Sequence, residues 1–129
     1  ALAAKGRPPC WRVPRMTRVN ETAQKIFHCL DGSRQSDARI VSYLSRQLGM
    51  SDRSLRRRCH EAFGYGPKTL HRILRFQRYL QMAESRTDAA AADLAMDAGY
   101  ADQPHLIRET RELAGLTPRE LVAQLAHRP

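Results

Sequence analysis

The chain of 129 residues contains no long apolar run, which argues against a membrane-spanning helix. The four alanines at residues 89–92 are among its longest runs of purely hydrophobic residues. The first residues also lack the apolar core of a signal peptide. We therefore expect a cytoplasmic protein with no membrane partner.

Cysteine is scarce, and its three positions do not form a metal-binding pattern. Cys10, Cys29 and Cys59 are odd in number and include no C-x-x-C pair, which argues against a disulfide framework and against a zinc site. The five histidines have no partner among themselves one helical turn away, and no nucleophile and base pair is evident. We expect no catalytic residue, no metal site, no cofactor and no enzymatic activity.

Acidic residues are in deficit, with 13 Asp and Glu against 22 Lys and Arg and a formal net charge of +9. Residues 1–33 carry 6 basic and 2 acidic residues, residues 34–83 carry 11 and 3, and residues 84–129 carry 5 and 8. A polyanion suits the first two regions, because each phosphate neutralised by a cation releases condensed counterions. The alternative is a solvated surface, which explains scattered charge better than concentrated charge.

One pattern occurs twice, 51 residues apart. It reads L-x-R-x-x-x-E-x-x-G-x-x-P-x-x-L, at residues 55–70 and again at residues 106–121. Upstream, a Leu and a Gly at residues 44–49 recur at residues 94–99. Each copy has the outline of a helix-turn-helix, namely helix, glycine-containing turn and helix. Two such units on a basic chain suggest a protein that reads two stretches of one DNA duplex.

Helical periodicity predicts an all-α fold of about seven helices. The expected segments are residues 19–31, 37–48, 52–63, 67–84, 88–98, 103–113 and 118–126. The expected caps and stops are Asn20, Gly32, Ser36, Gly49, Ser51, Gly99 and Asp102. Pro67 and Pro118 suit first-turn positions, because a helix start leaves peptide N–H groups without partners anyway.

These segments group into four parts. We expect a basic linker or tail at residues 1–18, a first helix-turn-helix subdomain at residues 19–66, a connector helix at residues 67–84 and a second subdomain at residues 85–129. At ~1.5 Å per residue the connector is about 26 Å long. Recognition helices in successive major-groove segments lie about 34 Å apart, and the connector with its flanking units suits that spacing.

The helix expected at residues 52–63 has an apolar stripe and a cationic face. Leu55, Cys59, Ala62 and Phe63 have the spacing of a buried stripe. The opposite face carries Arg53, Arg56, Arg57 and His60, with Arg58 on its flank. The planar fork of Arg fits the O6/N7 edge of guanine and also pairs with phosphate, so this face suits base readout and backbone contacts. A surface without a partner is the alternative.

The equivalent face of the second copy is less cationic. The 51-residue offset brings Pro104, Ile107, Arg108 and Arg111 to that face. Ile107 can pack against a thymine methyl group and Gln103 can pair with adenine, whereas Glu109 and Asp102 oppose phosphate. We therefore expect the first unit to supply most of the affinity and base discrimination.

Further cations are placed for contacts with the DNA backbone. Lys68, near the start of the connector, and Arg46, before the first glycine turn, are candidates for phosphate contact, with a solvated position as an equal alternative. The residues expected at the backbone are Arg46, Arg58, His60, Lys68 and Arg111.

The motif G-Y-A-D-Q-P-H-L-I-R-E-T-R-E-L-A-G-L-T-P-R-E-L at residues 99–121 resembles the signature region of bacterial AraC/XylS transcription regulators. Residues 44–67, L-S-R-Q-L-G-M-S-D-R-S-L-R-R-R-C-H-E-A-F-G-Y-G-P, resemble the first helix-turn-helix of that family. The resemblance covers about residues 19–126. It implies a seven-helix domain that binds double-stranded promoter DNA and usually activates transcription through RNA polymerase.

The resemblance also implies site residues and a longer protein. Family members often carry an N-terminal effector-binding domain, to which residues 1–18 would be the linker. Because the chain opens without Met, we expect a fragment of a longer bacterial protein that associates with the nucleoid, with a stand-alone short regulator as the alternative. By position, base reading falls on Arg53, Arg56, Arg57, Gln103, Ile107 and Arg108.

Two other interpretations remain open. Some related regulators are fused to a cysteine alkyl acceptor, but Cys59 lies on the expected buried stripe and Cys10 in a segment without helical or strand periodicity. Alternatively, one unit binds DNA and the acidic second unit is a protein-interaction module, facing polymerase or a partner subunit. The excess of acidic residues at residues 84–129 favours this second interpretation.

Overall fold

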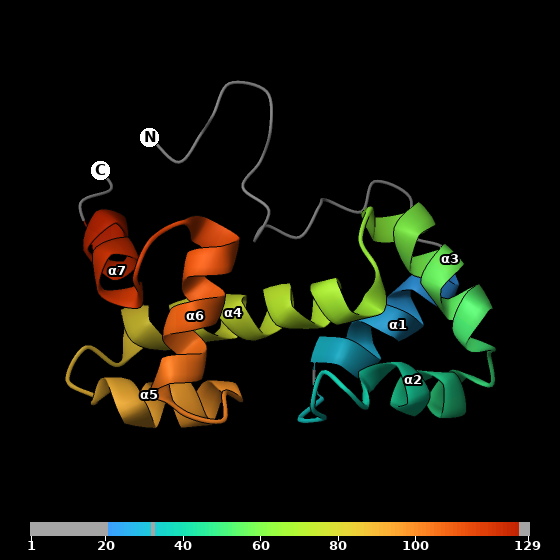
Figure 1. Ribbon diagram of the computed structural model, residues 1–129, viewed down its shortest axis with the longest axis horizontal. Coiled ribbons are helices and arrows are strands. Elements are labelled where there is room, and N and C mark those ends of the chain that lie inside the picture. The colour runs from blue at the N-terminus through green and yellow to red at the C-terminus, as the bar shows by residue number, and fades with distance from the viewer. Residues whose placement is uncertain (1–20, 32, 127–129) are drawn as a thin grey trace, which may run out of the picture. The chain divides into compact units, whose positions relative to one another are not determined.

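The computed structural model of the protein describes residues 21–31 and 33–126. These residues form seven helices and no strand, which confirms the all-α prediction (Figure 1). None of these helices is both long enough and apolar enough to cross a membrane. The expected cap at Asn20, the stop at Gly32 and the tail at residues 1–18 lie outside the described residues. The helices are α1 (Glu21–Asp31), α2 (Ile40–Leu48), α3 (Asp52–Phe63), α4 (Pro67–Ser85), α5 (Ala91–Ala98), α6 (Gln103–Ala114) and α7 (Pro118–Ala126).

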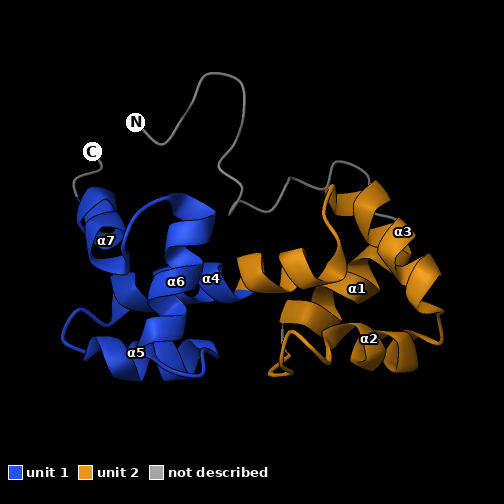
Figure 2. Cartoon of the chain, viewed as in Figure 1, with its two compact units in different colours: residues 1–12, 75–129 blue, residues 13–74 orange. Residues whose placement is uncertain are grey.

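The chain divides into two compact units, with the boundary between Leu74 and Arg75, inside α4 (Figure 2). Of the described residues, 21–31 and 33–74 form the N-terminal unit, which Figure 2 labels unit 2. Residues 75–126 form the C-terminal unit, labelled unit 1. Each unit therefore contains one pair of helices joined by a glycine turn, α2 with α3 and α5 with α6, and one half of α4.

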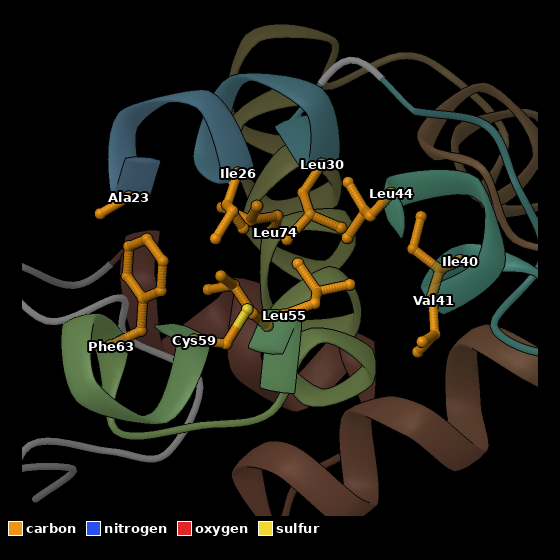
Figure 3. Packing of buried hydrophobic residues seen from close by; sticks show 11 residues of the cluster. Ala23, Ile26, Leu30, Ile40, Val41, Leu44, Leu55, Cys59, Phe63 and Leu74 are labelled. Atoms are coloured by element: carbon orange, nitrogen blue, oxygen red, sulfur yellow. The ribbon is translucent and has the colours of Figure 1, made fainter. Parts of the chain in front are cut away.

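The N-terminal unit is built around an apolar core that α1, α2 and α3 share. Ile26 of α1, Leu44 of α2 and Leu55 of α3 are fully buried, and Leu74 of α4 joins them. Figure 3 shows these side chains pointing toward one another from the surrounding helices. Burying one such side chain stabilises the fold by about 1.5–3 kcal/mol, so the shared core holds α3 in place.

The C-terminal unit buries the corresponding faces of its helices. In this unit α6 packs against both α5 and α7. Its buried apolar side chains include Phe76, Tyr79, Leu80, Leu94, Ala98, Leu106, Leu113 and Leu121. Leu94, Ala95 and Ala98 of α5 point inward, as the helical spacing predicts.

The glycine turns lie where the repeat predicts them. Gly49 follows α2 with a left-handed backbone (φ 64°), and its N–H donates to the Ser45 carbonyl. Gly99 follows α5 with a φ of 107°, and its N–H donates to the Ala95 carbonyl. A side chain in this region places its Cβ close to the carbonyl oxygen, which glycine avoids, so both turns reverse the chain without strain.

Two of the expected caps are confirmed in the structure. The Ser51 hydroxyl accepts a hydrogen bond from the Ser54 N–H at 3.1 Å, at the start of α3. The Asp102 carboxylate accepts one from the His105 N–H at 2.8 Å, at the start of α6. Pro104 lies in the first turn of α6, where its missing N–H costs little.

The expected cap at Ser36 is wrong. Helix α2 begins only at Ile40, and Arg39 precedes it without a side-chain capping bond. Residues 37–39 instead form a turn in which the Arg39 N–H donates to the Ser36 carbonyl at 3.0 Å. Ser36 therefore lies one turn too early. Helix α5 likewise begins at Ala91, three residues beyond Asp88.

We predict that Gly49→Ala destabilises the protein by about 1–2 kcal/mol, because the backbone there is left-handed while the space around an added Cβ is empty. Gly66→Ala is the matched control. Gly66 does not have a left-handed backbone, and its added Cβ would meet the His60 Nε2 at an ordinary 3.5 Å. Urea unfolding followed by circular dichroism measures both variants. Equal losses of stability would contradict the assignment of the cost to backbone strain.

Candidate nucleic-acid interface

A side-chain hydrogen bond across the first glycine turn joins α2 to α3. The Ser45 hydroxyl, in α2, donates to the Asp52 carboxylate at 2.6 Å, at the first residue of α3. With the Ser51 cap and the Gly49 turn, it fixes how α3 leaves the turn. The sequence pattern predicted the turn and the cap but not this bond, since serine and aspartate seven residues apart carry no motif.

Helix α3 presents a cationic face to solvent and an apolar stripe to the core. Leu55, Cys59 and Phe63 are at most 1% exposed, whereas Ala62 of the predicted stripe is only half-buried. The predicted positions on and beside the opposite face are all exposed: Arg53, Arg56, Arg57, Arg58 and His60. The stripe and the face therefore lie where the helical spacing predicts them, and roles of these residues toward DNA remain predictions.

Burial also determines the chemistry of Cys59. Burial raises the pKa of its thiol to about 11, so the side chain stays protonated at neutral pH. A buried, protonated thiol is a poor nucleophile, because the thiolate is the reactive form. Cys59 therefore acts as a packing residue, and its environment does not favour alkyl transfer.

Helix α6 has a smaller polar face. Gln103, Pro104, Arg108 and Arg111 are exposed, and Ile107 is half-buried. The opposite side of the helix is buried through Leu106, Thr110 and Leu113. The Thr110 hydroxyl donates to the Leu106 carbonyl at 2.7 Å, which satisfies the hydroxyl inside the core.

Glu109 does not oppose phosphate, and this prediction is wrong. Its side chain is 3% exposed and turns into the C-terminal unit, where it accepts two hydrogen bonds from Arg75 of α4. The Arg75 Nη2 lies 2.6 Å from Glu109 Oε1, and its Nε lies 3.1 Å from Oε2. Glu109 lies three residues after Leu106 and four before Leu113, so the helical spacing places it on the buried stripe.

The buried pair is part of a larger packing arrangement that positions α6. The Arg75 guanidinium lies over the Tyr100 ring, 5.1 Å from its centroid, and Tyr100 meets the His105 ring edge-on. Burial raises the pKa of Tyr100, and the negative charge of Glu109 acts in the same direction. Arg78, the next turn of α4, donates to the Ala98 carbonyl at 2.9 Å. Helix α4 therefore holds the end of α5 and the middle of α6.

The expected backbone residues outside the recognition helices are also at the surface. Arg46 is exposed in the last turn of α2, and Lys68 is exposed in the first turn of α4. Asp102 is the cap of α6, so its carboxylate is engaged with the His105 N–H. The structure therefore leaves the cations that were predicted to contact DNA accessible and gives Asp102 and Glu109 structural roles.

A family model described as a helix-turn-helix domain matches residues 44–124, more than half of the chain. The chain belongs to this AraC-type helix-turn-helix family. Searches of curated proteins and of solved structures found no match to the chain.

Membership of this AraC-type family establishes the kind of function. The matched residues include both glycine turns, α3, α4 and α6. Domains of this kind bind DNA sequence-specifically in the regulation of transcription, so DNA is a partner of this domain.

We predict that Glu109→Ala destabilises this AraC-type domain by about 3–5 kcal/mol, because it leaves the Arg75 charge buried without its partner. Glu84→Ala, at an exposed position of α4, removes the same side chain from the surface and changes stability by less than about 0.5 kcal/mol. Denaturant unfolding of both variants checks the difference. A Glu109→Ala protein as stable as the wild type would show that the pair does not hold α6.

Proposed function

We propose that both units read bases of one promoter duplex, with residues 52–63 of α3 and residues 103–113 of α6 in successive major-groove segments. The observation that carries this proposal is that α3 and α6 each have a buried apolar stripe on one side and an exposed face on the opposite side. One side of α3 is buried at Leu55 and one side of α6 at Leu106, so each helix turns its opposite side to solvent. An α-helix with such a face fits the major groove.

The chemistry of the two faces supports unequal roles. Arg53, Arg56 and Arg57 offer guanidinium forks that match guanine, and residues 34–83 hold half of the basic residues of the chain. In α6, Arg108 is the counterpart of Arg57, Gln103 suits adenine and Ile107 suits a thymine methyl group. The N-terminal unit then supplies most of the affinity, and the C-terminal unit adds fewer base contacts.

The remaining exposed cations serve as backbone contacts in this proposal. Phosphate contacts fix the register of a protein on the duplex without reading the sequence. Five exposed side chains near the recognition helices take this role: Arg46, Arg58, His60, Lys68 and Arg111.

We further propose that the protein activates transcription in the bacterial cytoplasm, at the nucleoid, by contacting RNA polymerase. The resemblance to AraC/XylS regulators supports this, and so does the excess of acidic residues at residues 84–129, which suits a basic protein partner beside the DNA-facing side of α6. An effector-binding domain N-terminal to this chain would control its activity. We also propose that the protein is not an enzyme, as is typical of helix-turn-helix DNA-binding families.

A second candidate function assigns the C-terminal unit to protein interaction alone. Helix α5 exposes Met96 at 64%, and Asp93 on the same helix is exposed as well, while Asp97 is paired with Arg86. An exposed apolar side chain among carboxylates suits a basic protein partner and repels a phosphate backbone. In this alternative only the N-terminal unit binds DNA.

Selection of bound sequences from a random duplex pool separates the two functions. If both units read DNA, we expect a bipartite site whose half-elements are about one helical turn, roughly 10 base pairs, apart. A single short element would contradict reading by both units and support the interaction module.

We predict that Arg56→Ala weakens binding to the selected site about tenfold or more, because one bidentate contact with guanine is worth about 1–3 kcal/mol. Arg108→Ala should cause a smaller loss, since α6 makes fewer specific contacts. Lys25→Ala, at an exposed position of α1, is the control for the loss of one positive charge. Fluorescence anisotropy with the selected duplex measures all three. A larger loss from Arg108→Ala would overturn the assignment of the major role to the N-terminal unit.

A further inference from the structure

Two surface grooves, one in each unit, lie beside the recognition helices. The Lys68 groove, about 210 Å³, is lined by Val41, Arg56, His60, Gly66, Pro67, Lys68 and Thr69. The Arg119 groove is larger, about 700 Å³. Its lining includes Arg86, Ala91, Gln103, Pro118, Arg119 and Val122.

The two grooves occupy equivalent places in the internal repeat. Pro67 and Lys68 recur 51 residues later as Pro118 and Arg119, and both pairs line their grooves. Val41 has its counterpart 50 residues later in Ala91, which lines the second groove. In each unit the groove therefore lies between the start of the helix before the glycine turn and the start of the helix after the recognition helix.

Both grooves are lined by positive charge without negative charge. Lys68 shares its groove with Arg56 and His60, and Arg119 shares its groove with Arg86. Among the described residues that line them, neither groove contains a carboxylate. Residues 84–129 hold 8 acidic and only 5 basic residues, so the Arg119 groove is a basic site within an acidic region of the chain.

Arg119 is the cation most available to a ligand in its groove. Arg86 is paired with Asp97 at 2.9 Å on the surface. Arg119 is exposed and has no ion-pair partner within the part of the chain that the structure describes. Lys68 is likewise exposed, without such a partner at residues 21–31 or 33–126. Each groove therefore has at least one cation without an ion-pair partner among the described residues.

Each groove also adjoins residues that read bases in the proposed function. Arg56 lines the Lys68 groove and belongs to the cationic face of α3, and Gln103 lines the Arg119 groove at the start of α6. A ligand in either groove thus lies next to the DNA-facing side of a recognition helix. Pro67 and Pro118 add apolar carbons to the groove walls, which suit the deoxyribose beside a phosphate.

We propose that each unit holds one DNA backbone phosphate in its groove, through Lys68 in the N-terminal unit and through Arg119 in the C-terminal unit. This inference rests on the proposed function and extends it to Arg119, which the sequence analysis left out. The C-terminal unit, in spite of its acidic composition, thereby has a second electrostatic contact with the duplex besides Arg111.

The salt dependence of binding tests the two contacts. The full chain is titrated with the selected duplex and with a random duplex between 50 and 200 mM salt, as wild type, Lys68→Gln and Arg119→Gln. Each lost phosphate contact reduces the magnitude of the negative slope of log affinity against log salt by about 0.9. The rise in salt from 50 to 200 mM therefore weakens binding of each variant by a factor about 3.5 times smaller than for the wild type. We expect this change on both duplexes, because a phosphate contact does not read sequence.

Matched controls separate a lost contact from a lost charge or a lost fold. Lys25→Gln removes one positive charge from an exposed position of α1 and should leave the slope almost unchanged. Circular dichroism melting curves should superpose for all variants, since the substituted side chains are exposed. In a second measurement, single neutral methylphosphonates are placed along the duplex. At one phosphate position the methylphosphonate should weaken binding of the wild type but not binding of Arg119→Gln, which has already lost that contact. At a different position it should weaken binding of the wild type but not binding of Lys68→Gln.

The outcomes distinguish this inference from the proposed function. Unchanged slopes for Lys68→Gln and Arg119→Gln, together with a loss of specific binding in Arg108→Ala, would overturn the inference and leave base reading by both units intact. A changed slope for Lys68→Gln alone, with no effect of Arg108→Ala, would overturn both the Arg119 contact and DNA reading by the C-terminal unit.

Discussion

Burial of one side of each recognition helix is the constraint on which the rest of the structure depends. The stripe of Leu55, Cys59 and Phe63 has a single orientation in which it leaves water, and this orientation turns the opposite arginines outward. The core that receives the stripe is shared by several helices, so it fixes the helix as a rigid body. The glycine turn and the serine cap then determine where the helix starts.

The two units use one framework with different polar chemistry. Helix α4 carries a polar anchor for each unit, since His71 lies 3.0 Å from the Asp37 carboxylate in the N-terminal unit and Arg75 pairs with Glu109 in the C-terminal unit. The N-terminal unit keeps its arginines on the surface of α3. In the C-terminal unit Arg75 of α4 and Glu109 of α6 are buried as a pair, where they add orientation at a cost in desolvation.

Most of the fold could be predicted from the sequence because local signals agreed with the repeat. Helical spacing, the glycines at 49 and 99 and the caps at Ser51 and Asp102 each have a short-range physical cause that a sequence displays. Ser36 misled because a hydroxyl before an apolar stripe is equally suited to a turn. Glu109 misled because its partner Arg75 is 34 residues away along the chain. The spacing within α6 places Glu109 on the buried stripe but does not show which residue pairs with a buried carboxylate. The repeat aligns Arg119 with Lys68 at an offset of 51 residues, but only the structure shows that both residues line equivalent grooves.

The position of the unit boundary inside α4 has a consequence for folding. Leu74 completes the core of one unit and Phe76, two residues later on the same unbroken helix, is buried in the other. Melting of either half of α4 removes hydrogen bonds of the type i to i−4 at the edge of its neighbour, and helix formation is cooperative over such a boundary. We therefore expect the two units to unfold as coupled elements of one transition, and the chain has no point near residue 74 where it can be divided without exposing a core.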